Sequence, residues 1–109
     1  MREIKFRGKS IDKSIKTGNW IYGGIVFNED RYWIDIPYYG NIIVDKDTIG
    51  QYTGQKDCNG TEIYEGDTVY DEMYKRNFKV IYRETAFELE SEDKKFYKRL
   101  EPAYCKVIE

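Results

Sequence analysis

The side chains best suited to chemistry in this sequence are carboxylates in a glycine-rich stretch, residues 48–69. Glu62, Glu65 and Asp67 lie close together there, and Gly66 separates the last two. Paired carboxylates can act as an acid and a base, or can bind a cation or a basic partner. Closely spaced acids usually face water, so a structural turn is the main interpretation. A binding pair of Glu65 and Asp67 is the alternative.

The other residue types argue against an enzyme. The chain has no histidine, which removes the usual general base near neutral pH and the commonest metal ligand. None of its serines has the sequence context of an activated nucleophile. Its two cysteines, Cys58 and Cys105, cannot supply a four-thiolate zinc site. We therefore expect no catalytic residue, no metal site and no cofactor.

Turn-forming residues predict that residues 48–69 form a corner between strands. Asn59 and Gly60 favour a type I′ hairpin turn, because both tolerate a positive φ. Gly50 and Gly54 predict bends at the two ends of a short extended piece. Gly66 predicts a tight entry into the strand that starts at residue 68.

Alternating apolar and polar residues predict strands along most of the chain. Gly23 and Gly24 predict a bulge or sharp bend within one of them. Ser91 as a cap and Pro102 as a stop predict a short helix over residues 91–100. The strands are expected at residues 2–7, 20–27, 31–36, 42–44, 68–74, 78–82, 86–90 and 104–108. The fold class is thus mostly β: a small curled antiparallel sheet or SH3-like barrel with a short C-terminal helix.

Four segments of the chain resemble one known family. They are residues 2–7 (REIKFR), 51–57 (QYTGQKD), 59–69 (NGTEIYEGDTV) and 104–108 (YCKVI). The chain resembles the YopX family of small phage and prophage proteins. This resemblance implies a mostly β protein of phage or prophage origin, without an established activity. Two features depart from the family: its members usually continue beyond the Val-Ile pair, and Cys58 stands where a polar residue is more usual.

Length and composition limit the class of protein further. A chain of 109 residues favours one domain, with N-terminal strands in residues 1–47 and a barrel-like core in residues 48–109. The net charge of −2 argues against general affinity for nucleic acid or for a membrane surface. No apolar leader or membrane segment is recognisable, so we expect a cytoplasmic location in the bacterial host and reduced cysteines.

The first functional hypothesis is a non-enzymatic protein-interaction module. Aromatic residues make up 17% of the chain and include eleven tyrosines, and tyrosine suits both sheets and interfaces. The expected partner is an unidentified host or phage protein. The expected site is the acidic corner, defined as Tyr52, Tyr64, Glu65 and Asp67.

A second aromatic surface remains open beside the acidic corner. Tyr38 and Tyr39, beside Trp33, could form an exposed aromatic patch, although core packing or plain turn residues is the main interpretation.

The second functional hypothesis is a single-stranded nucleic-acid-binding β-barrel. Such proteins combine basic side chains for phosphates with aromatic rings on which bases stack. The basic candidates are Arg2, Lys5, Arg7, Lys9, Lys13 and Lys16, and the candidate stacking rings are Trp20 and Trp33. The acidic balance of the whole chain disfavours this hypothesis.

Self-association is expected in either case. Residues 1–16 carry six Lys or Arg against two Asp or Glu, whereas residues 17–72 carry three against eleven. A basic start, an acidic middle and many short strands leave exposed edges that a second copy could cover.

Overall fold

Short antiparallel strands make up most of the chain. The computed structural model describes residues 4–14 and 17–108 and has eleven strands in that part of the chain. The residues separate into two units, Met1–Tyr52 and Thr53–Glu109. The mostly β fold class is thus confirmed.

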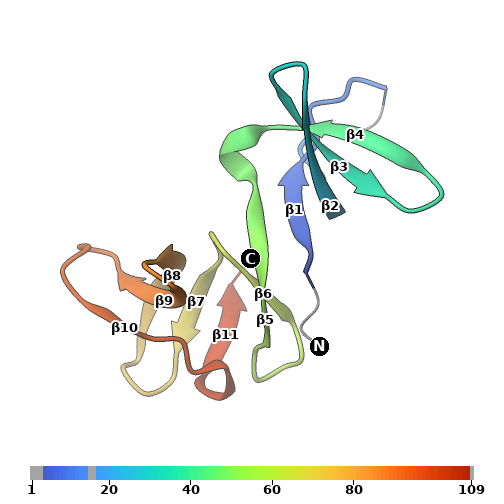
Figure 1. Ribbon diagram of the computed structural model, residues 1–109. Helices are drawn as coiled ribbons and strands as arrows, with labels where there is room; N and C mark the ends of the chain where they lie inside the picture. The colour runs from blue at the N-terminus through green and yellow to red at the C-terminus, as the bar shows by residue number, and fades with distance from the viewer. Residues whose placement is uncertain (1–3, 15–16, 109) are drawn as a thin grey trace. The chain divides into compact units, whose positions relative to one another are not determined.

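The first unit is one antiparallel sheet with the strand order β4-β3-β2-β1-β5 (Figure 1). Its strands are β1 (Phe6–Lys9), β2 (Trp20–Asn28), β3 (Arg31–Ile36), β4 (Gly40–Val44) and the start of β5 (Gly50–Lys56). A short 3-10 turn, Lys46–Thr48, joins β4 to β5. Directly after β1, Ser10 forms an isolated antiparallel bridge with Val44 of β4.

Strand β2 changes its pairing partner at the two glycines for which the sequence predicts a bulge or bend. Its first half pairs with β1 up to Gly23, and its second half pairs with β3 from Gly24 onward. A Cβ atom on Gly23 would lie 2.2 Å from the carbonyl oxygen of Asp35, whereas Gly24 has open space around it. Gly23 is therefore required by a close approach of two backbones.

The buried face of the first unit is built from aliphatic residues on neighbouring strands. Ile34 is opposite Ile25 of β2 and Ile42 of β4. Ile34, Ile42 and Val44 are buried. This cross-strand arrangement follows from the alternating pattern of residues 31–36.

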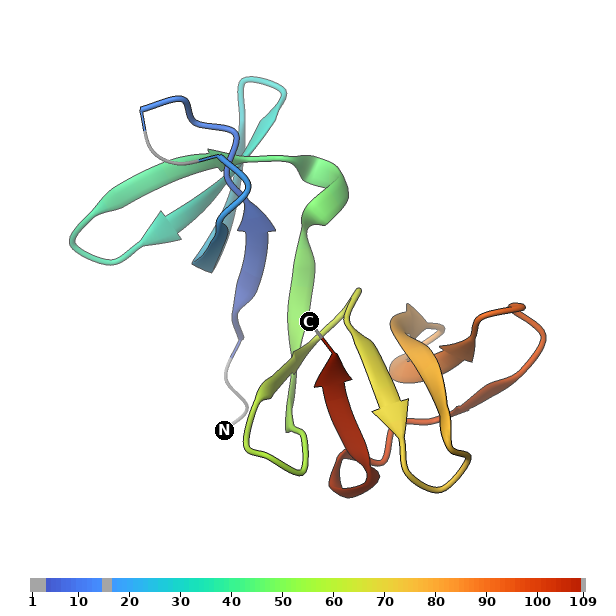
Figure 2. The same ribbon diagram turned by 180° about the vertical axis from the view of Figure 1, so that it is seen from behind.

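The second unit contains a five-stranded antiparallel sheet with the order β10-β9-β8-β7-β11. Figure 2 shows β11, β7 and β8 side by side. The strands are β7 (Thr68–Asp71), β8 (Arg76–Arg83), β9 (Ala86–Ser91), β10 (Tyr97–Arg99) and β11 (Cys105–Ile108). A further strand, β6 (Glu62–Tyr64), is not part of this sheet. It is the neighbour of β5 and the last strand in the order β4-β3-β2-β1-β5-β6.

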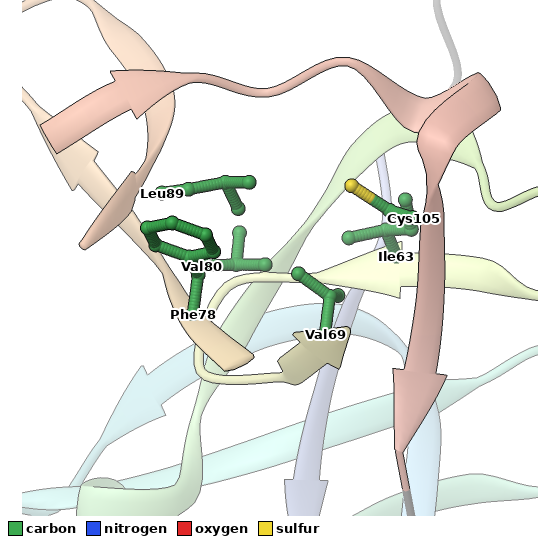
Figure 3. Packing of buried hydrophobic residues seen from close by; sticks show 6 residues of the cluster. All are labelled: Ile63, Val69, Phe78, Val80, Leu89 and Cys105. Carbon is green, nitrogen blue, oxygen red and sulfur yellow. The ribbon is translucent and has the colours of Figure 1, made fainter. Parts of the chain in front are cut away.

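One hydrophobic cluster forms the core of the second unit. Six side chains from five strands point toward one another in Figure 3, and each is at most 1% exposed. They are Ile63, Val69, Phe78, Val80, Leu89 and Cys105. Leu100 and Val107 pack against this cluster.

The predicted helix over residues 91–100 is wrong, because those residues form a turn and strand β10. Ser91 closes the turn instead of capping a helix: its backbone N–H donates to the carbonyl of Phe96, and its hydroxyl accepts from the Phe96 N–H. Tyr97 to Arg99 then pair with β9. Sheet pairing thus outweighs the local helix signals.

Two finer expectations also differ from the structure. Neither sheet closes into a barrel in the described part of the chain, so the SH3-like barrel is unconfirmed. The turn at Asn59 and Gly60 is not type I′, because Gly60 has a positive φ but Asn59 does not. The Gly60 N–H donates to the carbonyl of Asp57, so the turn starts two residues before Asn59.

Candidate functional site

Asp57 fastens the turn after β5 to the last strand of the chain. Its Oδ1 accepts hydrogen bonds from the backbone N–H groups of Asn59 and Thr61, at 2.8 and 2.9 Å. Its Oδ2 accepts from the N–H of Val107 in β11 at 2.8 Å. Burial raises the pKa of Asp57, but these donors and the charge of Lys106 outweigh it, so the pKa lies below the ordinary value. This buried carboxylate stabilises the fold.

Asp67 closes the next turn in the same way. Its Oδ2 accepts a hydrogen bond from the backbone N–H of Tyr64 at 2.8 Å, and its own N–H donates to the Tyr64 carbonyl at 3.1 Å. Gly66 has φ +95° between them, and its N–H donates to the carbonyl of Val80. The structural interpretation of this Glu-Gly-Asp turn therefore matches the geometry.

Asp71 and Lys98 form a buried ion pair that sequence reasoning missed. Lys98 Nζ lies 2.6 Å from Asp71 Oδ2, and the two side chains are 7% and 0% exposed. Asp71 Oδ1 also accepts from the backbone N–H groups of Met73 and Tyr74. Burial raises the pKa of Asp71, but Lys98 and the backbone donors outweigh it and leave the pKa below its ordinary value. Both oxygens of Asp71 therefore accept hydrogen bonds, which compensates for the burial of this carboxylate.

Cys105 lies opposite Asp71 in the sheet and is fully buried. Burial, followed by the charge of Asp71, raises the pKa of its thiol to about 11. Such a thiol is protonated near neutral pH and is a poor nucleophile. Both cysteines are free thiols, and Cys58 is the exposed one.

Three of the four residues of the acidic corner are buried. Tyr52 ends the first unit at 5% exposure, whereas Tyr64 and Asp67 lie in the second unit at 2% and 8%. Glu65 is half-buried. Only Glu65 therefore presents an appreciable charged surface at this corner, and the binding role of the four residues stays a prediction.

From the sequence, the alternative role of the carboxylate pair Glu65 and Asp67 is to bind a cation. Within residues 4–14 and 17–108, no three His, Cys, Asp or Glu side chains are placed to hold a metal ion. Glu62 instead accepts a hydrogen bond from the hydroxyl of Tyr64 at 3.0 Å.

The basic candidates of β1 lie beside an aromatic ring in the first unit. The Arg7 guanidinium carbon is 3.9 Å from the centroid of the Trp20 ring, and Lys9 Nζ is 5.1 Å from it. Arg7 is also paired in register with Tyr22. These distances are those of cation–π contacts. Arg2 and Lys16 lie outside the described residues.

Trp33 belongs to a different part of the first unit. It is paired in register with Val26 of β2 and Ile43 of β4. Its indole N–H donates to the carbonyl of Asn28 at 3.3 Å. The structure therefore separates the two tryptophans by strand and by partner.

The turn between β3 and β4 carries the most exposed aromatic side chains. Tyr38 is 110% exposed and Tyr39 is 68% exposed. In Figure 1 this turn is a loop that projects beyond the paired ends of β3 and β4. Of the three interpretations of these tyrosines from the sequence, core packing is wrong, and both an exposed patch and plain turn residues agree with their exposure.

A comparison with known protein families assigns the chain to one of them. A family model described as YopX protein matches residues 3–108. The chain belongs to the YopX family. No curated protein matches it. In the described residues, no helix has the length and apolar character needed to cross a membrane.

Proposed function

We propose that this chain is a non-enzymatic protein-interaction module. The observation that supports the proposal is the exposure of its aromatic residues. Eight aromatic side chains in the described residues are at least 37% exposed: Tyr22, Phe27, Tyr38, Tyr39, Tyr74, Tyr82, Phe96 and Tyr104. Aromatic residues combine a large contact area with low conformational entropy, and they dominate the energetics of protein interfaces.

The role of the buried polar groups is consistent with this proposal. Asp57, Asp67 and Asp71 each bind the backbone of a neighbouring turn. Lys98 binds Asp71, and the Cys105 thiol is within hydrogen-bond reach of the Glu101 carbonyl. These groups hold the scaffold, which leaves the surface aromatic residues to make contacts.

The proposal includes a phage or prophage origin and a site of action inside the bacterial host. The support for both is the family to which the chain belongs. The partner is a host or phage protein, and a second copy of the chain is an additional partner.

The test is affinity capture followed by reconstitution. The tagged chain is used to capture proteins from host cells, and each captured protein is then purified and titrated against the chain by calorimetry. Saturable binding with a fixed stoichiometry supports the proposal. Absence of any partner that binds after purification contradicts it. Glu65→Lys is titrated in parallel, and unchanged affinity removes the acidic corner as the site.

Single-stranded nucleic-acid binding is a second candidate, favoured by the contact of Arg7 and Lys9 with the Trp20 ring. A base could stack on aromatic residues beside cations that contact phosphates. The test is the binding of a fluorescent oligonucleotide across a range of salt concentrations. Affinity that rises steeply as salt falls, and that Lys9→Glu weakens, supports this function. No binding at low salt excludes it.

A further inference from the structure

The β3–β4 turn has a residue that its backbone conformation disfavours. The backbone N–H of Tyr39 donates to the carbonyl of Ile36 at 3.0 Å, which closes a four-residue turn. Pro37 occupies the second position, and Tyr38 occupies the third with φ +65°. Proline followed by a positive φ defines a type II turn, whose third position normally requires glycine or asparagine. Tyrosine there is unfavourable for the backbone.

Packing does not compensate for this conformation. The Tyr38 side chain is 110% exposed, so the fold shields none of the ring from water. Residues in sparsely populated backbone conformations cluster at functional sites, where the surrounding structure holds them. Pro37 and the Ile36–Tyr39 hydrogen bond hold this turn for any residue at position 38, so they do not explain why that residue is tyrosine.

The other turns of the chain provide an internal comparison. Six non-glycine residues in the described part have a positive φ, and five of them are charged: Glu29, Asp30, Lys75, Glu84 and Lys94. Charged residues at these positions keep their hydration at an exposed turn. Tyr38 is the one aromatic member of this set. It therefore combines an unfavourable backbone conformation with an apolar ring exposed to water.

Resting on the proposed interaction function, we propose that Tyr38 and Tyr39, here called the tyrosine tip, form the docking anchor of the module. The tip inserts into an apolar pocket on the surface of a folded partner protein. A projecting hairpin end is convex, so it fits a concave site. Two adjacent tyrosines supply ring area for the pocket and hydroxyl groups for hydrogen bonds at its edge.

The charges around the tip identify the class of partner. Residues 32–43 contain Asp35 and no Lys or Arg. Asp35 is paired in register with Asn41 near the base of the turn, and both are exposed. Binding to nucleic acid or to an anionic membrane needs cations, which this segment lacks. The tip therefore suits a protein pocket bordered by Lys, Arg or hydrogen-bond donors.

The experiment first finds the partner through the tip and then measures its affinity. A photo-reactive p-benzoylphenylalanine replaces Tyr39 in one version of the full chain and Tyr104 in another, and both are irradiated in host cells. The cross-linked protein is identified, purified and titrated against the unmodified chain. Tyr38→Gly and Tyr39→Ser are titrated with it. Asp30→Gly is the matched control, because it relieves another exposed left-handed turn residue of the same unit.

The expected result is cross-linking from position 39, with a loss of affinity of at least about tenfold in Tyr38→Gly. Asp30→Gly is expected to bind within about twofold of the unmodified chain. Circular dichroism confirms that each variant is folded.

Three results would overturn the tyrosine tip. In the first, a purified partner binds Tyr38→Gly and Tyr39→Ser as tightly as the unmodified chain, which removes the tip but leaves the interaction function intact. In the second, position 39 cross-links only to a second copy of the chain, which removes the proposed class of partner. In the third, neither position cross-links and capture yields no partner, which removes both the tip and the interaction function.

Discussion

A single hydrogen bond of 2.8 Å joins the carboxylate of Asp57 to the backbone N–H of Val107, fifty residues further along the chain. It ties the first turn of the second unit to its last strand. The same carboxylate holds the N–H groups of Asn59 and Thr61. One side chain therefore organises a local turn and a long-range contact together.

Replacement of Asp57 by asparagine is expected to destabilise the second unit. The new side-chain amide keeps one oxygen acceptor but presents an NH₂ group to a backbone donor, so one buried N–H loses its partner. The expected loss in the free energy of unfolding is about 2 kcal/mol. Urea unfolding followed by circular dichroism measures it. Asp47→Asn, at an exposed position, is the control and should change the free energy by less than about 0.5 kcal/mol.

Acid should weaken the fold through the same carboxylates. The pKa values of Asp57 and Asp71 lie below the ordinary value of 3.8. A carboxyl whose pKa is lower in the folded than in the unfolded chain contributes stability above the unfolded pKa, and this stability is lost as pH falls through the folded pKa. The free energy of unfolding should therefore fall below about pH 4.

Urea titrations at a series of pH values test this dependence on the two carboxyls. The double variant Asp57→Asn and Asp71→Asn should show a shallower decrease at acidic pH than the unmodified chain. An equally steep decrease in both proteins would assign the acid sensitivity to other groups.

Removal of one member of the buried ion pair should be more damaging than removal of both charges. Lys98→Met leaves the Asp71 carboxylate buried without its cation, and the expected loss is about 3–5 kcal/mol. Lys98→Met combined with Asp71→Asn should recover part of this loss. Thermal unfolding compares the three proteins. A double variant that is less stable than Lys98→Met alone would contradict this account of the pair.

The two adjacent glycines of β2 should respond differently to the same substitution. A Cβ at Gly23 would lie 2.2 Å from the carbonyl oxygen of Asp35, and one at Gly24 meets nothing within 4 Å. Gly23→Ala is therefore expected to cost about 1–3 kcal/mol, whereas Gly24→Ala should be neutral or slightly stabilising. Denaturant unfolding distinguishes them, and equal losses would argue against a close backbone approach at Gly23.

The sequence predicts strands well where alternation is strong and local. Residues 31–36 place Tyr32, Ile34 and Ile36 at alternate positions, and β3 has these same bounds. The special role of Gly23 was predictable, because a glycine inside a strand often marks a bulge or a close approach of another backbone. The helix over residues 91–100 failed because Ser91, its expected cap, uses its hydrogen bonds to close a loop.

Features that depend on distant partners could not be predicted. Lys98 reaches Asp71 across 27 positions, and nothing near either residue indicates that contact. The acidic corner looked accessible because Glu65 and Asp67 flank a glycine, but Asp67 is engaged by the Tyr64 N–H. The tyrosine tip had a partial signal, because Pro37 favours the second position of a type I or type II turn, and a type II turn places a positive φ on Tyr38.

The central claim has two parts. The aspartates that bind the backbone of turns stabilise the fold, whereas Tyr38 contributes to partner binding and not to the stability of the folded chain. The free energy of unfolding of Tyr38→Gly tests it most directly. Relief of the left-handed conformation gains about 1–2 kcal/mol, and the extra freedom of glycine in the unfolded chain costs about 0.5–1 kcal/mol. The account predicts a gain of up to about 1.5 kcal/mol in denaturant unfolding. A loss of stability would contradict it, because Tyr38 would then be part of the scaffold.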